Sequence, residues 1–106
     1  MTTLTSTDIN NLIKNNSMVL LCFYGNSCGV CTVISSALDK EMLNFPNIHY
    51  KKIFVSDNIE SFASFDIFTL PVVLLFVDGK EFLREARNIS IRDLLFNIDR
   101  LYKLYQ

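Results

Sequence analysis

The stretch MVLLCFYGNSCGVC, residues 18–31, decides the fold of this chain. It opens with an uninterrupted apolar run, turns at a glycine and an asparagine, and ends with two cysteines that have two residues between them. The run from Met18 to Tyr24 does not alternate between apolar and polar residues, which is typical of a strand buried on both faces. After the cysteines, apolar residues recur at helical spacing: Val30, Val33, Ile34, Ala37, Leu38 and Met42. The stretch predicts a strand, a tight turn and a helix, the context in which a CxxC pair indicates redox chemistry.

The composition is that of one globular domain spanning residues 1–106. A chain of this length can bury a hydrophobic core without disulfide staples, and half of its residues are apolar. A net charge of −1 does not favour a nucleic-acid partner, because binding to phosphates requires clustered Lys and Arg. We interpret the one basic doublet, Lys51-Lys52, as the solvated end of a strand.

The sequence also predicts where the protein works. The first residues lack a basic segment followed by an apolar one, so we expect no signal peptide. The longest apolar run is far shorter than the roughly 20 residues that span a bilayer, so we expect no membrane association. We therefore expect a cytoplasmic, reducing location. There, three cysteines fit one working pair and one buried thiol better than a structural disulfide framework.

The other elements follow from spacing and from turn residues. A first helix follows a cap at Thr5, Ser6 or Thr7 and ends at Asn15-Asn16. The cysteine helix runs to about Leu43 and is stopped by Pro46. The remaining segments are a strand at 48–55, a short helix at 58–65, a strand at 72–77, a returning strand at 80–85 after the Asp78-Gly79 turn, and an amphipathic helix after Ser90.

Several residues that could carry chemistry have a simpler interpretation. Phe62, Phe65 and Phe68 are expected in the core, together with the stripe of the last helix: Ile91, Leu94, Leu95, Ile98, Leu101, Tyr102 and Tyr105. Cys22 could be a third redox thiol or a metal ligand, but its place in an apolar strand favours a packed, inert thiol. A structural zinc site takes four N/S ligands, and His49 is the only histidine, so we expect no metal.

Together these elements predict an α/β fold. Strand, helix, strand, crossing helix, hairpin and final helix describe a three-layer sandwich with a central mixed sheet and helices on both faces. The sheet has four strands, or five if the first five residues add an edge strand.

This order of elements resembles the thioredoxin family from about Ser6 to Tyr105. The resemblance rests on Cys28-Gly29-Val30-Cys31 after the first long strand, on Thr69-Leu70-Pro71, and on the Asp78-Gly79 turn. It implies a thioredoxin-like thiol–disulfide oxidoreductase that reduces protein disulfides and serves cell redox homeostasis and electron transport. A disulfide reductase or a low-molecular-weight thiol would be its electron donor. We expect a monomer without a cofactor.

The resemblance also assigns the site. Cys28 is the nucleophile, Cys31 is the resolving thiol, and Pro71 is a cis-proline beside them. The backbone of Leu70 pairs with substrate, and Ser27 belongs to the same binding surface. A helix N-terminus favours an anion, so the predicted place of Cys28 is consistent with a reactive thiolate.

Four positions depart from the family pattern. Ser27 stands where an aromatic residue is usual, Val30 where proline is usual, and Cys22 where a buried acid is expected. The glycine expected near Arg87 is also absent. Gly29 and Val30 form the motif turn that sets the reduction potential. The chain also has no Trp, and the missing Trp, proline and buried acid favour an alternative function, a thioredoxin-like protein-interaction module with little redox turnover.

Overall fold

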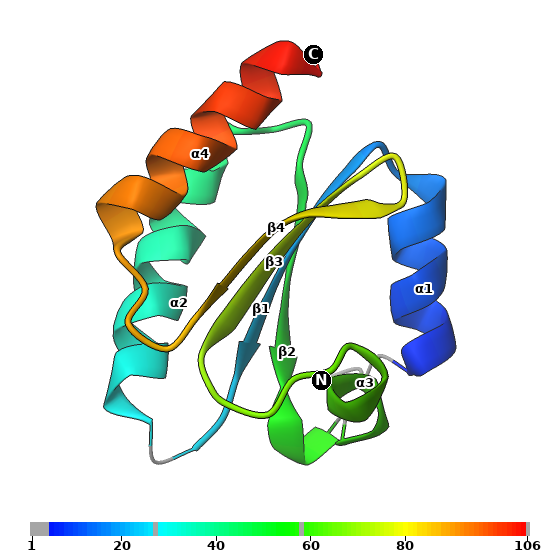
Figure 1. Cartoon of the computed structure of the whole chain (residues 1–106), viewed down its shortest axis with the longest axis vertical. Coiled ribbons are helices and arrows are strands. Elements are labelled where there is room, and N and C mark those ends of the chain that lie inside the picture. The colour runs from blue at the N-terminus through cyan, green and yellow to red at the C-terminus, as the bar shows by residue number, and fades with distance from the viewer. Residues whose placement is uncertain (1–4, 27, 58, 106) are drawn as a thin grey trace.

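The computed structural model describes residues 5–26, 28–57 and 59–105, and Figure 1 shows their arrangement. The main elements are α1 (Ser6–Asn15), β1 (Met18–Tyr24), α2 (Gly29–Glu41), β2 (His49–Phe54), α3 (Ile59–Ser64), β3 (Val72–Val77), β4 (Lys80–Ala86) and α4 (Ile91–Leu104). Two short 3-10 turns, η1 (Met42–Asn44) and η2 (Val55–Asp57), follow α2 and β2. The edge strand considered for the first five residues falls almost entirely outside the described part of the chain.

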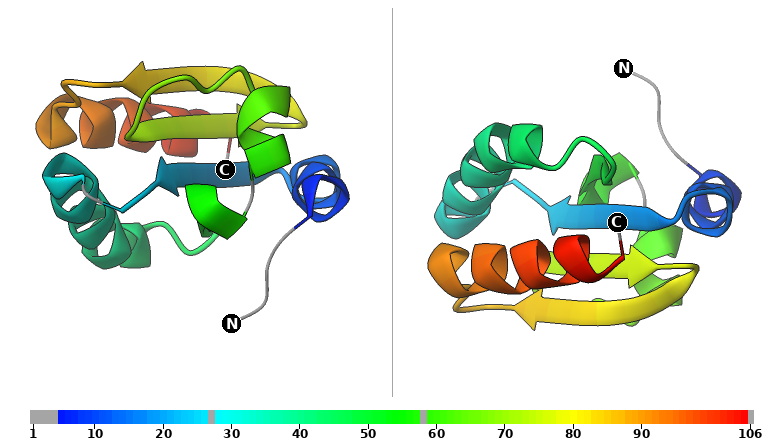
Figure 2. Two further views of the ribbon diagram at one scale, coloured as in Figure 1. Left: turned by 90° about the horizontal axis from the view of Figure 1, so that it is seen from below. Right: turned by 90° about the horizontal axis from the view of Figure 1, so that it is seen from above.

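The four described strands form one mixed sheet in the order β2-β1-β3-β4. β1 runs parallel to β2 and antiparallel to β3, and β3 and β4 form the expected hairpin. Asp78 and Gly79 take up the turn with positive φ angles of 51° and 82°. Figure 2 shows three layers, with α1 and α3 on one face of the sheet and α2 and α4 on the other. The predicted α/β sandwich is therefore confirmed.

β1 lies in the middle of the core and supplies side chains to both faces. Met18, Leu20 and Cys22 point toward α2 and α4. Their neighbours along the strand, Val19, Leu21 and Phe23, point toward α1 and α3. Each of these side chains is at most 1% exposed. This double burial explains why the sequence of β1 shows no polar alternation.

Polar caps define where the outer helices begin. Thr5 precedes α1 and forms a reciprocal capping box with Asp8, in which each backbone N–H donates to the other side chain. Ser90 precedes α4 and accepts a hydrogen bond from the backbone N–H of Asp93 at 3.2 Å. Both caps satisfy N–H groups that have no partner within the helix.

Three local expectations were wrong. Phe68 is 86% exposed, because α3 ends at Ser64 and the helical spacing does not continue into the loop that follows. Tyr105 is 44% exposed, because it follows the last residue of α4, and its ring packs edge-on against Phe82 at 5.5 Å. The Lys51-Lys52 doublet lies within β2 rather than at its end, and both residues are exposed.

Gly25 gives a test of packing at the end of β1. A Cβ atom at Gly25 would lie 2.8 Å from Leu70 Cδ1 and 2.9 Å from Val55 Cγ1. We expect Gly25→Ala to lower the free energy of unfolding by about 1–2 kcal/mol, because two neighbours must shift. Gly29→Ala is the matched control, since a Cβ there meets no atom within 4 Å. Urea unfolding of the reduced proteins should separate the two variants, and equal stabilities would contradict this packing.

Candidate active site

The two cysteines of the motif lie at the start of α2. Cys28 is the N-cap residue with an extended backbone, and Cys31 lies in the first turn of the helix. The pair forms a disulfide with a Cα–Cα distance of 5.2 Å. Cys28 Sγ also accepts a hydrogen bond from the backbone N–H of Cys31 at 3.2 Å. The helix therefore directs one of its unpaired N–H groups at the sulfur of the first cysteine.

The two sulfurs differ in their access to solvent. Cys28 is half-buried, whereas the Cys31 side chain is 1% exposed and packs inside the molecule. The expected difference in exposure is confirmed. An incoming thiol or disulfide therefore meets Cys28 first.

Pro71 lies beside the end of β1, at the same end of the sheet as the cysteines that follow β1. Phe23 pairs with Val72, so the next residues, Tyr24 and Pro71, are close neighbours across the two strands. The Leu70–Pro71 peptide bond is cis, as the resemblance implied. Pro71 is buried and Leu70 is half-buried. Ser27, the remaining member of the predicted binding surface, lies outside the described residues.

Arg87 occupies the place where the family pattern led us to expect a glycine. Its φ angle is 61°, in the left-handed region that glycine adopts most readily. Its backbone N–H donates a hydrogen bond to the carbonyl oxygen of Pro71 at 3.3 Å. The backbone conformation expected of a glycine is therefore present without the glycine, and it ties the end of β4 to the proline.

Arg84 fixes the segment that leads to Pro71, and we did not predict this role from the sequence. Its Nη2 donates to the carbonyl oxygen of Phe65 at 2.9 Å and to Glu81 Oε1 at 2.8 Å. The hydrogen bond from Arg84 lowers the pKa of Glu81. The guanidinium group thus links β4 to the loop that follows α3.

Cys22 is a packed thiol, as the sequence analysis interpreted it. It is fully buried in β1 and lies opposite Lys52 of β2 in the strand register. Burial raises the pKa of its thiol to about 12, so the group stays protonated at neutral pH. A protonated thiol neither attacks a disulfide nor binds a metal well. No cluster of three or more His, Cys, Asp or Glu side chains that could hold a metal ion occurs within residues 5–26, 28–57 and 59–105.

A polar network beside Cys22 joins α2 to β2. Lys52 Nζ lies 3.0 Å from Asp39 Oδ2, and the Tyr50 hydroxyl donates to Asp39 Oδ1 at 2.8 Å. The same hydroxyl lies 3.4 Å from the carbonyl oxygen of Ser35, and Lys52 Nζ lies 5.9 Å from the centre of the Tyr24 ring. Tyr50 and Lys52 are two residues apart in β2 and so share a face, which was the available sequence signal. Their partner Asp39 comes from another element, which spacing does not reveal.

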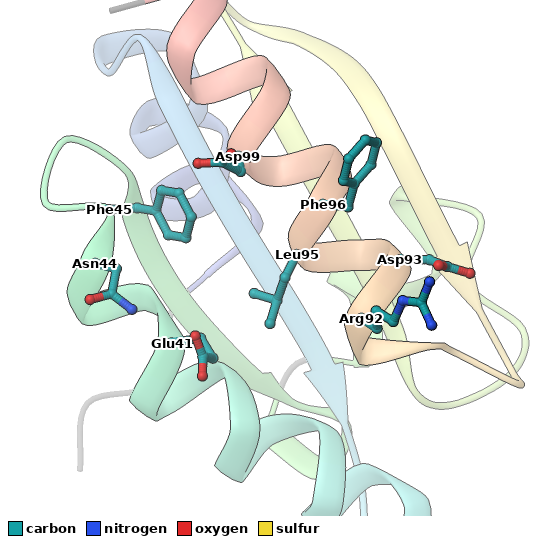
Figure 3. Close-up of a pocket in the computed structure, with 8 residues that line it drawn as sticks. All are labelled: Glu41, Asn44, Phe45, Arg92, Asp93, Leu95, Phe96 and Asp99. Atoms are coloured by element: carbon teal, nitrogen blue, oxygen red, sulfur yellow. The ribbon is translucent and has the colours of Figure 1, made fainter.

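Two hollows in the described surface are candidate sites. The larger, about 690 Å³, lies between α2 with its η1 extension and α4 and is shown in Figure 3. Its lining side chains are Glu41, Asn44, Phe45, Arg92, Asp93, Leu95, Phe96 and Asp99. The smaller, about 410 Å³, is lined in part by Cys28 itself. Because the cysteine pair is the reactive chemistry of this chain, the smaller hollow marks the candidate site.

A cysteine pair that closes into a disulfide at the first turn of a helix exchanges two electrons with other thiols by thiol–disulfide exchange. On a mixed sheet covered by helices on both faces, this pair defines a thioredoxin-fold thiol–disulfide oxidoreductase. The sequence model of the Thioredoxin family matches residues 1–98, and the chain belongs to that family.

Known relatives agree with this assignment. The chain is 38% identical over 98 residues to the thioredoxin-like protein YdfQ of Bacillus subtilis, covering 92% of this chain and 88% of that protein. The X-ray structure of Fasciola hepatica thioredoxin is similar with a TM-score of 0.83 and 25% identity, covering 92% of this chain and 95% of that one. Oxidised mitochondrial thioredoxin 3 of Saccharomyces cerevisiae shares the fold with a TM-score of 0.82, 23% identity and coverage of 92% and 91%.

Among the described residues, no helix is both long and apolar enough to cross a bilayer.

The buried Cys22 thiol predicts a loss of stability at alkaline pH. Its pKa in the folded chain is about 12, above the ordinary value of 9.0. Its stabilising contribution is therefore complete below about pH 9 and decreases as the pH rises toward 12, because the unfolded chain releases the proton first. At pH 10.5 this group should remove about 2 kcal/mol from the free energy of unfolding.

Urea unfolding of the oxidised protein at pH 7.5 and pH 10.5 measures this loss. The control is Cys22→Val, which keeps an apolar side chain of similar size and has no proton to lose. We expect the variant to lose less stability than the parent between the two pH values. Burial and the hydrogen bond to Asp39 also raise the pKa of Tyr50, so Tyr50 contributes a loss of the same sign in both proteins. Identical losses in both proteins would show that Cys22 is not held protonated.

Proposed function

We propose that the protein reduces disulfide bonds in partner proteins, with Cys28 as the attacking thiolate and Cys31 as the resolving thiol. The Cys28 thiolate attacks one sulfur of the partner's disulfide, which forms a mixed disulfide and releases the other partner sulfur as a thiolate. The Cys31 thiolate then attacks Cys28 Sγ and releases the second partner thiolate. The partner gains two electrons, and the cysteine pair is left as the disulfide.

The hydrogen bond from the Cys31 N–H to Cys28 Sγ is the observation that carries the assignment of roles. In the reduced protein the same N–H group and the N-terminus of α2 would stabilise a thiolate on Cys28. The half-buried position of Cys28 supports its attack on a bulky partner. The burial of Cys31 supports its role in the second step, because Cys31 attacks Cys28 Sγ and does not have to reach the partner protein itself.

The partner would lie along the backbone before Pro71. An extended segment pairing with the main chain of Leu70 gains affinity with little demand on its sequence, as in strand addition. We include Ser27 in this surface because it precedes Cys28 in the chain. We also propose that a disulfide reductase or a low-molecular-weight thiol reduces the cysteine pair again after each turnover. The protein would work in a reducing compartment such as the cytoplasm, where an unpaired thiol like Cys22 is ordinary.

Insulin reduction tests the assigned roles. The parent protein should accelerate the reduction of insulin by a dithiol reductant. Cys28→Ser should reduce the rate to that of the reductant alone, because a hydroxyl cannot form the mixed disulfide. Cys31→Ser should lose turnover as well, but it should accumulate a mixed disulfide on Cys28 that mass spectrometry detects.

Cys22→Ser is the matched control for a cysteine outside the pair, and it should keep turnover within about twofold of the parent once folding has been verified. Parent-like turnover by Cys28→Ser would refute the nucleophile assignment. A parent protein that is alkylated readily at Cys28 but does not turn over would favour the interaction module. Ser27, Val30 and Cys22, the departures from the family pattern, make that the second candidate.

A further inference from the structure

A hollow of about 410 Å³ opens beside Cys28 on the side of β1 that faces away from Pro71. Its walls come from the end of β1, the first turns of α2 and the end of β2, and its main lining residues are Tyr24, Asn26, Cys28, Thr32, Ser35 and Phe54. In the sheet order β2-β1-β3-β4, β2 and β3 flank β1 on opposite sides. Pro71 precedes β3, whereas the hollow extends toward β2. The hollow and Pro71 therefore lie on opposite sides of β1.

The size and chemistry of the hollow suit a small molecule. Ligand pockets have volumes of about 300–1,000 Å³ and combine apolar walls with a few polar groups. Here Tyr24 and Phe54 provide aromatic walls, their ring centres 5.1 Å apart, and Thr32 and Asn26 provide exposed polar groups. Apart from the thiol of Cys28 and the phenol of Tyr24, its described lining has no ionisable side chain.

Charges of both signs lie just behind this lining. Lys52 Nζ lies 5.9 Å from the centre of the Tyr24 ring and pairs with Asp39 at 3.0 Å. The Tyr50 hydroxyl connects Asp39 to the carbonyl oxygen of Ser35. Because Lys52 and Asp39 neutralise each other and neither lines the hollow, the hollow selects a compact molecule by its size and its polar contacts rather than by its net charge.

We propose that this hollow binds the part of a low-molecular-weight thiol that surrounds its SH group, while that thiol reduces the Cys28–Cys31 disulfide. This rests on the proposed role of Cys28 as the reactive thiol. The thiolate of the small molecule attacks Cys28 Sγ, the Cys28–Cys31 bond breaks, and Cys31 leaves as a thiolate that takes a proton from water. A second molecule of the thiol attacks the sulfur of the first. This step releases the disulfide of the small thiol and restores the Cys28 thiolate, so that two thiols are oxidised for each protein disulfide reduced.

Rates of reduction of the oxidised protein by two thiols of different size test this site. Glutathione has a body that would fill the hollow, and 2-mercaptoethanol has almost none. Thr32→Trp places a large ring in the hollow from an exposed position of α2, and Thr32→Ser is the matched control. We expect Thr32→Trp to slow reduction by glutathione about tenfold, a typical effect of altered pocket fit. Reduction by 2-mercaptoethanol should change less than twofold, and Thr32→Ser should match the parent with both thiols.

A second variant and a second reaction keep the test decisive. Asn26→Trp closes the same hollow from the turn after β1 and should reproduce the selective loss, which covers the case in which Thr32→Trp folds poorly. Insulin reduction by either variant, driven by 2-mercaptoethanol, should stay within twofold of the parent. An equal slowing of both thiols, or no slowing of either, would overturn the site.

A slowing of insulin reduction to the same degree as that of glutathione would also overturn it, by assigning the hollow to protein substrates. Failure of the redox function itself would look different. In that case the unmodified parent would not accelerate insulin reduction above the rate of the reductant alone, whichever reductant is used.

Discussion

The burial of β1 on both faces is the constraint on which the rest of the structure depends. Because alternate side chains of this strand enter the two halves of the core, both faces of the sheet must be covered by helices. α2 and α4 cover the face that contains Cys22, and α1 and α3 cover the face that contains Phe23. A polar residue within β1 would face apolar side chains whichever way it pointed. The constraint therefore fixes the layers, and it is consistent with a small apolar thiol, Cys22, at the position where a buried acid was expected.

The same strand places the chemistry. β1 has β2 on one side and β3 on the other, and it ends at Tyr24, where the chain leaves the sheet for the cysteine turn. Since β3 is antiparallel to β1, the start of β3 lies beside the end of β1, which brings Pro71 next to that turn. Since β2 is parallel to β1, its end at Phe54 also lies beside the same turn. The ends of β1 and β2 and the start of β3 thus meet just before the cysteine turn, and the pairing of the strands alone is sufficient to bring them together.

Much of this could be predicted from the sequence, because the strongest signals are local. The bounds of β1 and β3 agree with the predictions, since each strand is an apolar run that ends at a turn residue. What could not be predicted depends on contacts between elements or on the end of a helix. Phe68 follows Phe65 at helical spacing but lies beyond the end of α3, so its ring faces solvent. The Asp39–Lys52 pair joins α2 to β2, and spacing within one element does not reveal it. The positive φ angle of Arg87 could not be predicted from the sequence either, because arginine does not indicate a left-handed backbone.

Cys22 stands where the family pattern led us to expect a buried acid, and a buried thiol holds its proton differently from a carboxyl group. A thiol with a pKa near 12 cannot accept a proton from Cys31 at neutral pH, so that proton has to leave by another route. The carboxylate of Asp39 is close to Cys22 in the fold, but both of its oxygens are engaged by Tyr50 and Lys52. Neither Cys22 nor Asp39 therefore offers an acceptor for a proton from Cys31. Cys31 is itself 1% exposed, and its partner Cys28, which lines the hollow beside Tyr24, is the member of the pair that solvent reaches.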